Sequence, residues 1–186
     1  MLTKQSATAH ATCSRLEGKG EGNMEKLTHF NSNGRARMVD VGAKDRTERE
    51  AAARAVVYLN AETYALVRDG HMKKGDVLAV AQVAGIMAAK RTSDILPMCH
   101  PLMLTGCDID FDQCDMDATI TINATVRCTG ETGVEMEALT AATAAALTIY
   151  DMCKANQRDI RIGDVQLLRK SGGKSGDYIH EENALS

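Results

Sequence analysis

Residues 107–128, CDIDFDQCDMDATITINATVRC, contain two runs in which polar and apolar residues alternate. A period of two is typical of β-strands that have one buried and one solvent-exposed face. The polar segment DQCDMDA (112–118) between the runs predicts a turn, so we expect the two strands to pair as an antiparallel hairpin. The second strand should direct one row of side chains into the core, consisting of Ile120, Ile122, Ala124 and Val126.

The segment before the hairpin predicts one strand followed by two helices. RAVVYL (54–59) has the composition of a strand, and Asn60 is placed to cap a short helix that stops at Gly70. Asp76 is placed to cap a longer helix, VLAVAQVAGIMAAKR (77–91). Because nearly all of its residues are apolar, we expect this longer helix to be buried on most of its circumference.

The segment after the hairpin predicts a second long helix, LTAATAAALTIYDMCKAN (139–156), and then a last strand or strand pair, DIRIGDVQLLRK (159–170). Strands paired in one layer, with helices packed on one face of that layer, make an α+β fold. The patterned region predicts a single α+β domain over 27–178. Residues 1–26 show no sustained periodicity and are expected to be a flexible N-terminal extension, with 179–186 as a C-terminal tail.

The composition favours one core built from small side chains. The chain has 186 residues, which fits a single domain. Hydrophobic residues make up 44% of it but aromatic residues only 3%, so Ala, Val, Ile, Leu and Met must fill the core. So few aromatic side chains argue against a platform on which nucleic-acid bases stack.

The charge and the cysteines argue against several classes of partner. The net charge of −3 offers no overall basic field for nucleic acid or for an anionic membrane, so any anion site must be local. The six cysteines form no C-x-x-C pair and no apolar signal-peptide segment is visible, so we expect free thiols and a cytoplasmic location. No apolar run approaches about 18 residues, the length expected of a transmembrane helix.

The loop ILPMCHPL (95–102) contains both prolines of the chain. Two fixed φ angles stiffen the backbone around Met98, Cys99 and His100, so an imidazole there would lose little entropy on binding a ligand. A helix stop followed by a bend explains the first proline but not the second, which favours a functional His100. A structural zinc site is not expected, because no second Cys or His lies at a standard ligand spacing.

Two glutamates stand near the start of the second long helix, in TGVEMEALT (132–140). If this piece is extended, Glu135 and Glu137 lie on one face; if it is already helical, only Glu137 shares a face with Asp151. The helix dipole also favours glutamates at a helix N-terminus. The motif alone therefore does not decide between a functional and a structural role.

Asp151 and Lys154 stand three residues apart near the end of the same helix. Residues at this spacing share one helix face. A carboxylate beside a lysine suits proton transfer, because partial burial lowers the lysine pKa while the carboxylate orients the ammonium group. An exposed ion pair without a function is the alternative. The apolar neighbours Ala144 and Leu147 indicate that the pair emerges from a buried face.

The segment KSGGKSGD (170–177) is similar to a phosphate-binding loop but lacks two features of a P-loop. Leu168 occupies the position of a required glycine, and a short polar tail follows where a helix is needed. What remains is a mobile glycine-rich segment whose Lys170 and Lys174 can close over an anionic ligand.

Taken in order, KKGDVLAVAQVAGIMAAKRTSDILPMCHPL (73–102), TGVEMEALTAATAAALTIYDMCKA (132–155) and LLRKSGGKSGD (167–177) resemble the cyclic pyranopterin monophosphate synthase family of molybdenum cofactor biosynthesis. The resemblance runs from about Leu27 to Asp177. It implies a ferredoxin-like α+β fold and a homohexamer, a trimer of dimers, with active sites between subunits. The implied reaction is a lyase-type conversion of (8S)-3′,8-cyclo-7,8-dihydroguanosine 5′-triphosphate into cyclic pyranopterin monophosphate and diphosphate. No cofactor is implied, although Mg²⁺ can accompany the triphosphate.

The resemblance also implies roles for individual residues. Asp151 and Lys154 match the family's catalytic pair. The pterin end of the substrate pocket is implied to be lined by Met98, Cys99, His100, Glu135, Met136 and Glu137, and the triphosphate end by Lys74, Lys170 and Lys174. The chain departs from the family pattern in its longer N-terminal segment and at Glu131, where a basic or neutral residue is expected. Neither departure removes a matched catalytic position.

A single chain has difficulty in bringing these residues together. If the second long helix is continuous, Glu137 and Asp151 stand about 20 Å apart at about 1.5 Å per residue, too far to meet on one small molecule. A site shared between two subunits removes the difficulty. The rival hypothesis is a non-catalytic sensor of nucleotide phosphate, which needs Lys170 and Lys174 but makes no demand on Asp151.

Overall fold

The predicted hairpin is present in the computed structural model, which describes residues 33, 35 and 37–181. Strands β2 (Leu104–Cys114) and β3 (Thr119–Gly130) pair antiparallel. The four side chains of the predicted inward row on β3 are fully buried. The acidic residues at 108, 110 and 112 of β2 are exposed, so the alternation in the sequence correctly separates the two faces of the hairpin.

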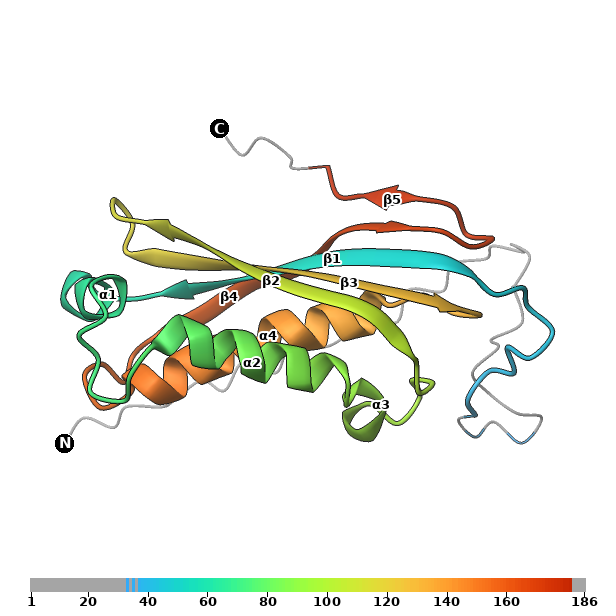
Figure 1. Ribbon diagram of the computed structural model, residues 1–186, viewed down its shortest axis with the longest axis horizontal. Coiled ribbons are helices and arrows are strands. Elements are labelled where there is room, and N and C mark those ends of the chain that lie inside the picture. The colour runs from blue at the N-terminus through green and yellow to red at the C-terminus, as the bar shows by residue number, and fades with distance from the viewer. Residues whose placement is uncertain (1–32, 34, 36, 182–186) are drawn as a thin grey trace, which may run out of the picture.

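Five strands form one antiparallel sheet in the order β2-β3-β1-β4-β5. β1 (Thr47–Tyr58) lies between β3 and β4 (Arg161–Ser171), and β5 (Tyr178–Ile179) pairs with the outer edge of β4. The chain passes from β1 through helices to β2, and from β3 through one long helix to β4, which is the β-α-β-β-α-β order of ferredoxin-like folds. Both long helices lie on the same face of the sheet (Figure 1). The predicted α+β, ferredoxin-like fold is confirmed.

β1 is longer than predicted, because it begins at Thr47 rather than at Arg54. Alternate residues of its central part face the helices, and this row is fully buried: Ala51, Ala53, Ala55 and Val57. The start of the strand is polar, with Glu48, Arg49 and Glu50 in sequence. These residues line cavities instead of packing in the core, so the apolar alternation does not extend to them.

The predicted domain over 27–178 remains a prediction. Near its C-terminal limit, Ile179 of β5 pairs with Arg169 of β4. The expected extension over residues 1–26 lies outside the described residues, and so do residues 182–186 of the expected tail.

Both predicted capping residues occupy helix N-caps. The Asn60 side chain accepts a hydrogen bond from the Thr63 amide at 2.7 Å where α1 (Ala61–Arg68) begins. The Asp76 side chain accepts one from the Ala79 amide at 3.0 Å where α2 (Val77–Ala89) begins. A single turn, α3 (Thr92–Ile95), then leads into the proline loop.

The expectation that the long apolar helix is buried on most of its circumference is wrong for the single chain. α2 buries one face only, which is made of Val77, Ala81, Gly85 and Ala89. Its opposite side leaves large apolar side chains exposed: Val80 at 46%, Val83 at 62% and Met87 at 44%. Composition cannot distinguish the two sides of such a helix, because apolar residues stand on both.

The buried face of α2 packs against α4 (Glu135–Cys153), the 19-residue helix that runs along the sheet. Small residues dominate the buried face of α4, including Ala138, Ala142 and Ala145, so the two helices approach closely. Across the described residues, no helix combines the length and the apolar character that a membrane crossing requires.

Gly85 is the closest point of approach, and its replacement by alanine should destabilise the fold. A Cβ atom there would stand 2.4 Å from Ile109 Cδ1 and 2.9 Å from the Ala141 carbonyl oxygen, and the second contact is backbone that cannot turn away. Helix propensity favours alanine by about 1 kcal/mol. We expect the overpacking to prevail, and Gly85→Ala to lower the free energy of unfolding by about 1–3 kcal/mol.

Urea denaturation followed by circular dichroism measures this effect. Ala79→Ser, on the exposed side of α2, is the control and should change the free energy of unfolding by less than about 0.5 kcal/mol. A Gly85→Ala protein as stable as the parent would show that the overpacking costs no more than the about 1 kcal/mol that helix propensity gains.

Candidate active site

Asp151 and Lys154 form an ion pair on the last turn of α4. Lys154 Nζ lies 2.6 Å from Asp151 Oδ1, as the spacing of three residues predicts. A third residue joins them, because Lys74 Nζ lies 3.1 Å from Asp151 Oδ2 and donates to the Asp151 carbonyl oxygen at 2.8 Å. The carboxylate therefore stands between two ammonium groups.

Lys74 reaches this position from the turn between α1 and α2. Gly75 has a φ of 93°, a left-handed conformation that suits glycine, and its amide donates to the Met72 carbonyl at 3.0 Å. The turn brings Lys74 against the carbonyl end of α4, where the helix dipole favours a cation. A lysine implied to bind triphosphate thus lies with the two residues that the resemblance implies to be catalytic.

The electrostatics of the pair differ from the prediction. The hydrogen bond to Asp151 raises the pKa of Lys154, where partial burial was expected to lower it. Lys154 and then Lys74 lower the pKa of Asp151 by donating to its carboxylate. About half of each side chain of the pair is exposed in the single chain, so desolvation is weak and the charged forms are favoured.

The face of α4 that carries the pair is also more open than expected. Leu147, which was expected to lie on a buried stripe, is 57% exposed. Ala144 is partly buried. Leu147 lies one turn before Asp151 and adds to the exposed apolar side of α2. The single chain therefore presents apolar surface near the charged triad formed by Lys74, Asp151 and Lys154.

A cavity of about 710 Å³ lies at the opposite end of α4, where the proline loop meets the helix N-terminus. It brings together the residues implied for the pterin end: Met98, Cys99, His100, Glu135, Met136 and Glu137. α4 begins at Glu135, so the helical alternative for the two glutamates is correct. Glu137 consequently points inward and is only 4% exposed, while Glu135 is partly buried.

Glu137 is the most perturbed carboxyl group of this region. Burial raises its pKa to about 7, with a smaller contribution from the charge of Glu135, while a hydrogen bond with its own backbone amide acts in the opposite direction. Burial also raises the pKa of the nearby Cys99 thiol, and the Glu137 charge adds to that effect. The cavity therefore holds a carboxyl group that can exchange a proton near neutral pH.

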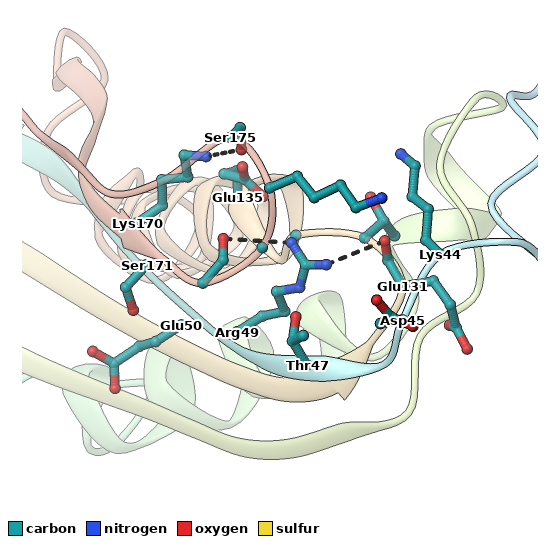
Figure 2. Close-up of a pocket in the computed structure, with 15 residues that line it drawn as sticks. Lys44, Asp45, Thr47, Arg49, Glu50, Glu131, Glu135, Lys170, Ser171 and Ser175 are labelled. Carbon is teal, nitrogen blue, oxygen red and sulfur yellow. Dashed lines mark hydrogen bonds between the residues drawn. The ribbon is translucent and has the colours of Figure 1, made fainter.

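A second cavity, of about 480 Å³, adjoins the first and is lined by Lys174 and Lys170. Figure 2 shows Lys170 and other residues of its wall. Two further basic residues line it, Lys44 and Arg49. Four acidic residues also line it: Asp45, Glu50, Glu131 and Glu135. The Thr47 hydroxyl in its wall is buried and has no hydrogen-bond partner within the described residues. Cations and an unused hydroxyl make this cavity suitable for an anion.

Arg49 joins the glycine loop to the rest of this cavity. Its guanidinium donates to the carbonyl oxygens of Gly130 and Glu131 at 3.3 Å and of Gly172 at 3.4 Å (Figure 2). Gly172 and Gly173 have φ values of 89° and 80°, and a Cβ atom on Gly173 would stand 1.7 Å from Arg49 Nη1. The two glycines thus allow the loop to close over the arginine.

The two cavities are adjacent, because both are lined by Lys44, Thr132, Gly133 and Glu135. They lie at the N-terminal end of α4, and the charged triad lies at the C-terminal end (Figure 1). Lys154 follows Glu135 by 19 positions, which span about 28 Å at about 1.5 Å per residue. The structure therefore brings the implied residues together in two groups, but it does not join the groups within one chain.

Lys44, Thr47 and Arg49 are cavity residues that the sequence reasoning missed. Extending the alternation of β1 back to Thr47 would have placed Thr47 and Arg49 on the inward row, as inward polar residues that require an explanation. No comparable signal exists for Lys44, which precedes the strand. Among the described residues, no group of three or more His, Cys, Asp or Glu side chains is arranged to hold a metal ion.

Comparison with known proteins agrees with the resemblance in the motifs. The family model described as the MoaC family matches residues 38–173. The cyclic pyranopterin monophosphate synthase of Thermoanaerobacter sp. (strain X514) is 61% identical over 155 residues, which cover 83% of this chain and 98% of that protein. The protein of the same name from Heliobacterium modesticaldum is 58% identical over 159 residues, which cover 86% and 100%. The family match includes Lys74, Asp151 and Lys154 and the cavity residues up to Gly173, and the chain belongs to the MoaC family.

Proposed function

We propose that this protein is a cyclic pyranopterin monophosphate synthase. It would convert (8S)-3′,8-cyclo-7,8-dihydroguanosine 5′-triphosphate into cyclic pyranopterin monophosphate and diphosphate, as a lyase of molybdenum cofactor biosynthesis. The observation that carries the proposal is the Asp151–Lys154 pair, held by Lys74, in a chain whose relatives bear that name. The cytoplasmic location remains a prediction.

The proposed active site is shared between two copies of the chain. One copy would supply Lys74, Asp151 and Lys154, and its neighbour would supply the two adjoining cavities. The separation of about 28 Å within one chain supports this, because a small substrate cannot bridge it. The exposed apolar residues of α2 and Leu147 also support an assembly, since such surface is usually covered by a partner. We propose the homohexamer, a trimer of dimers, as that assembly.

In this site Lys154 would act as general acid and base, and Asp151 would orient it. Formation of the cyclic phosphate makes a new P–O bond at the α-phosphorus and breaks the bond to the β-phosphate, so diphosphate leaves while a hydroxyl proton passes to a base. Burial by a neighbouring subunit would lower the pKa of Lys154 from its raised value in the single chain.

Lys170 and Lys174 would neutralise the departing diphosphate. The proposed reaction uses no organic cofactor, and Mg²⁺ can accompany the triphosphate.

Subunit complementation tests the shared site. The Lys154→Ala protein and the double variant Lys170→Ala/Lys174→Ala should each release little diphosphate alone. When the two are co-expressed, random pairing in dimers leaves about a quarter of the sites with no substitution, so about a quarter of the activity should return. The same two proteins mixed after assembly are the control.

The outcomes separate the proposals. Recovery above the control supports a site built from two chains, and its absence would contradict that site. If the parent protein binds the cyclised nucleotide tightly but forms no diphosphate, a phosphate sensor replaces the enzyme as the function.

A further inference from the structure

The segment 38–45, here called the strap, leads into β1 and lies along both cavities. Val39 and Val41 line the larger cavity, and Lys44 lines both. The Lys44 side chain stands beside Glu131, on the side of the smaller cavity opposite Lys170 (Figure 2). The position of the strap therefore determines where the Lys44 ammonium group lies at the junction of the two cavities.

His100 attaches the strap to the proline loop. Its Nε2 atom lies 2.7 Å from the Val39 carbonyl oxygen. A carbonyl oxygen only accepts hydrogen bonds, so Nε2 must carry the proton. The other hydrogen bonds that the described residues provide within the strap are local: the Lys44 amide donates to the Val41 carbonyl, and the Gly42 amide donates to the Asp40 carboxylate. The contact with His100 spans 61 positions and ties Val39, near the start of the strap, to the proline loop. At the other end, Arg46 directly follows the strap, donates to the Thr129 carbonyl oxygen at 3.2 Å and pairs with Glu131 at 3.5 Å.

The His100 side chain is well suited to hold the strap. His100 is partly buried between Pro97 and Pro101, in a loop that the fixed φ angles stiffen. A rigid donor loses little freedom when it holds a mobile acceptor, so one hydrogen bond there restricts the strap effectively.

We propose that His100 is a positioning residue that acts through Lys44. Its Nε2–H group holds the strap so that the Lys44 ammonium group faces an anionic group of the ligand where the two cavities join. The proposal deepens the proposed function and rests on it, because the anion is a phosphate group of the substrate or product. It differs from a role in which the imidazole contacts the pterin directly.

A double-mutant cycle on binding of inorganic diphosphate, measured by calorimetry on the full-length protein, tests this role. Lys44→Ala should weaken binding about tenfold, as expected for loss of one charged hydrogen-bond donor. His100→Ala should weaken it about fivefold by releasing the strap. In the Lys44→Ala background, His100→Ala should then change affinity by less than about twofold, because the group it positions is gone.

Hydrogen exchange distinguishes this positioning role from a direct contact between the imidazole and the ligand. Without ligand, His100→Ala should accelerate amide exchange over residues 38–45. His100→Gln should slow it again and recover affinity, because the glutamine amide can donate from nearly the position of Nε2. Met103→Ala, at an exposed site in the same loop, is the control and should leave exchange in the strap unchanged.

Several results would overturn the role. Equal losses from His100→Ala with and without Lys44 would show that the imidazole acts independently, and an unchanged affinity in Lys44→Ala would remove the group it is proposed to position. Exchange in the strap that is the same in parent and His100→Ala, or equal defects in His100→Gln and His100→Ala, would also contradict it. Turnover of the cyclised nucleotide by the parent protein is measured separately, so absence of turnover rejects the proposed function while the binding cycle still judges His100.

Discussion

Lys154→Ala should abolish diphosphate release while leaving the fold intact. About half of the lysine side chain is exposed and its partner is a surface carboxylate, so its removal disturbs no core contact. If Lys154 transfers the proton in the chemical step, its loss should lower the single-turnover rate by about 10²–10⁴-fold. Rapid-quench measurement of diphosphate, with circular dichroism and unfolding midpoints in parallel, measures both parts of the prediction.

Two further variants separate proton transfer from charge. Lys154→Arg keeps the positive charge beside Asp151 but remains protonated throughout the accessible pH range, so it should be nearly as inactive as the alanine variant. Lys73→Ala removes an exposed neighbouring lysine outside the triad and should retain the parent rate. A near-normal rate in Lys154→Ala would remove this residue from the chemistry, and a near-normal rate in Lys154→Arg would reduce its role to electrostatic stabilisation.

Glu137→Gln should stabilise the protein at alkaline pH and have little effect in acid. The pKa of Glu137 is raised from 4.5 to about 7 in the folded chain, so the folded state binds the proton more tightly than the unfolded state. Below pH 4.5 the carboxyl group is neutral in both states and no stability is lost. Between pH 4.5 and 7 the unfolded state ionises first, so the free energy of unfolding falls, and above pH 7 the loss is complete.

The size of the effect follows from the same pKa values. The difference between 4.5 and about 7 corresponds to about 3 kcal/mol at pH 8, and the neutral amide should recover about 2–3 kcal/mol of it. Denaturant unfolding at several pH values measures this. Glu135→Gln, on the adjacent and more exposed carboxyl, is the matched control and should shift stability by less than about 0.5 kcal/mol. Parallel pH profiles for the parent and Glu137→Gln would show that Glu137 is as well solvated in the folded state as in the unfolded one.

The features that the sequence predicted correctly are local ones. The alternation over 119–128 places Ile120 and Ile122 in the core, and Asn60 and Asp76 cap the helices they precede. The ion pair of Asp151 with Lys154 follows from their spacing on one helix. In each case the geometry of one element decides the outcome, and that geometry is periodic.

The predictions that were wrong concern what packs against a helix or strand, not the helix or strand itself. α2 and the stripe through Leu147 were expected to be buried, and Lys154 was expected to have a lowered pKa. All three expectations require another surface against these residues, and the single chain does not provide it. The start of β1 was missed for a related reason, because Arg49 points toward the glycine loop and not into the apolar core.

The sequence by itself determined the order of the main strands and helices, the face that the strand over 119–128 buries, and the motifs that identify the family. Only the tertiary structure decided that Glu137 is buried while Glu135 lines the junction of two cavities, and that Lys74 stands with Asp151 instead of with Lys170. The physical reason is that periodicity and capping act within a few residues, whereas shared cavities and ion pairs depend on where rigid elements place their ends. A helix of 19 residues keeps its two ends apart, and this separation divides the implied site into two groups.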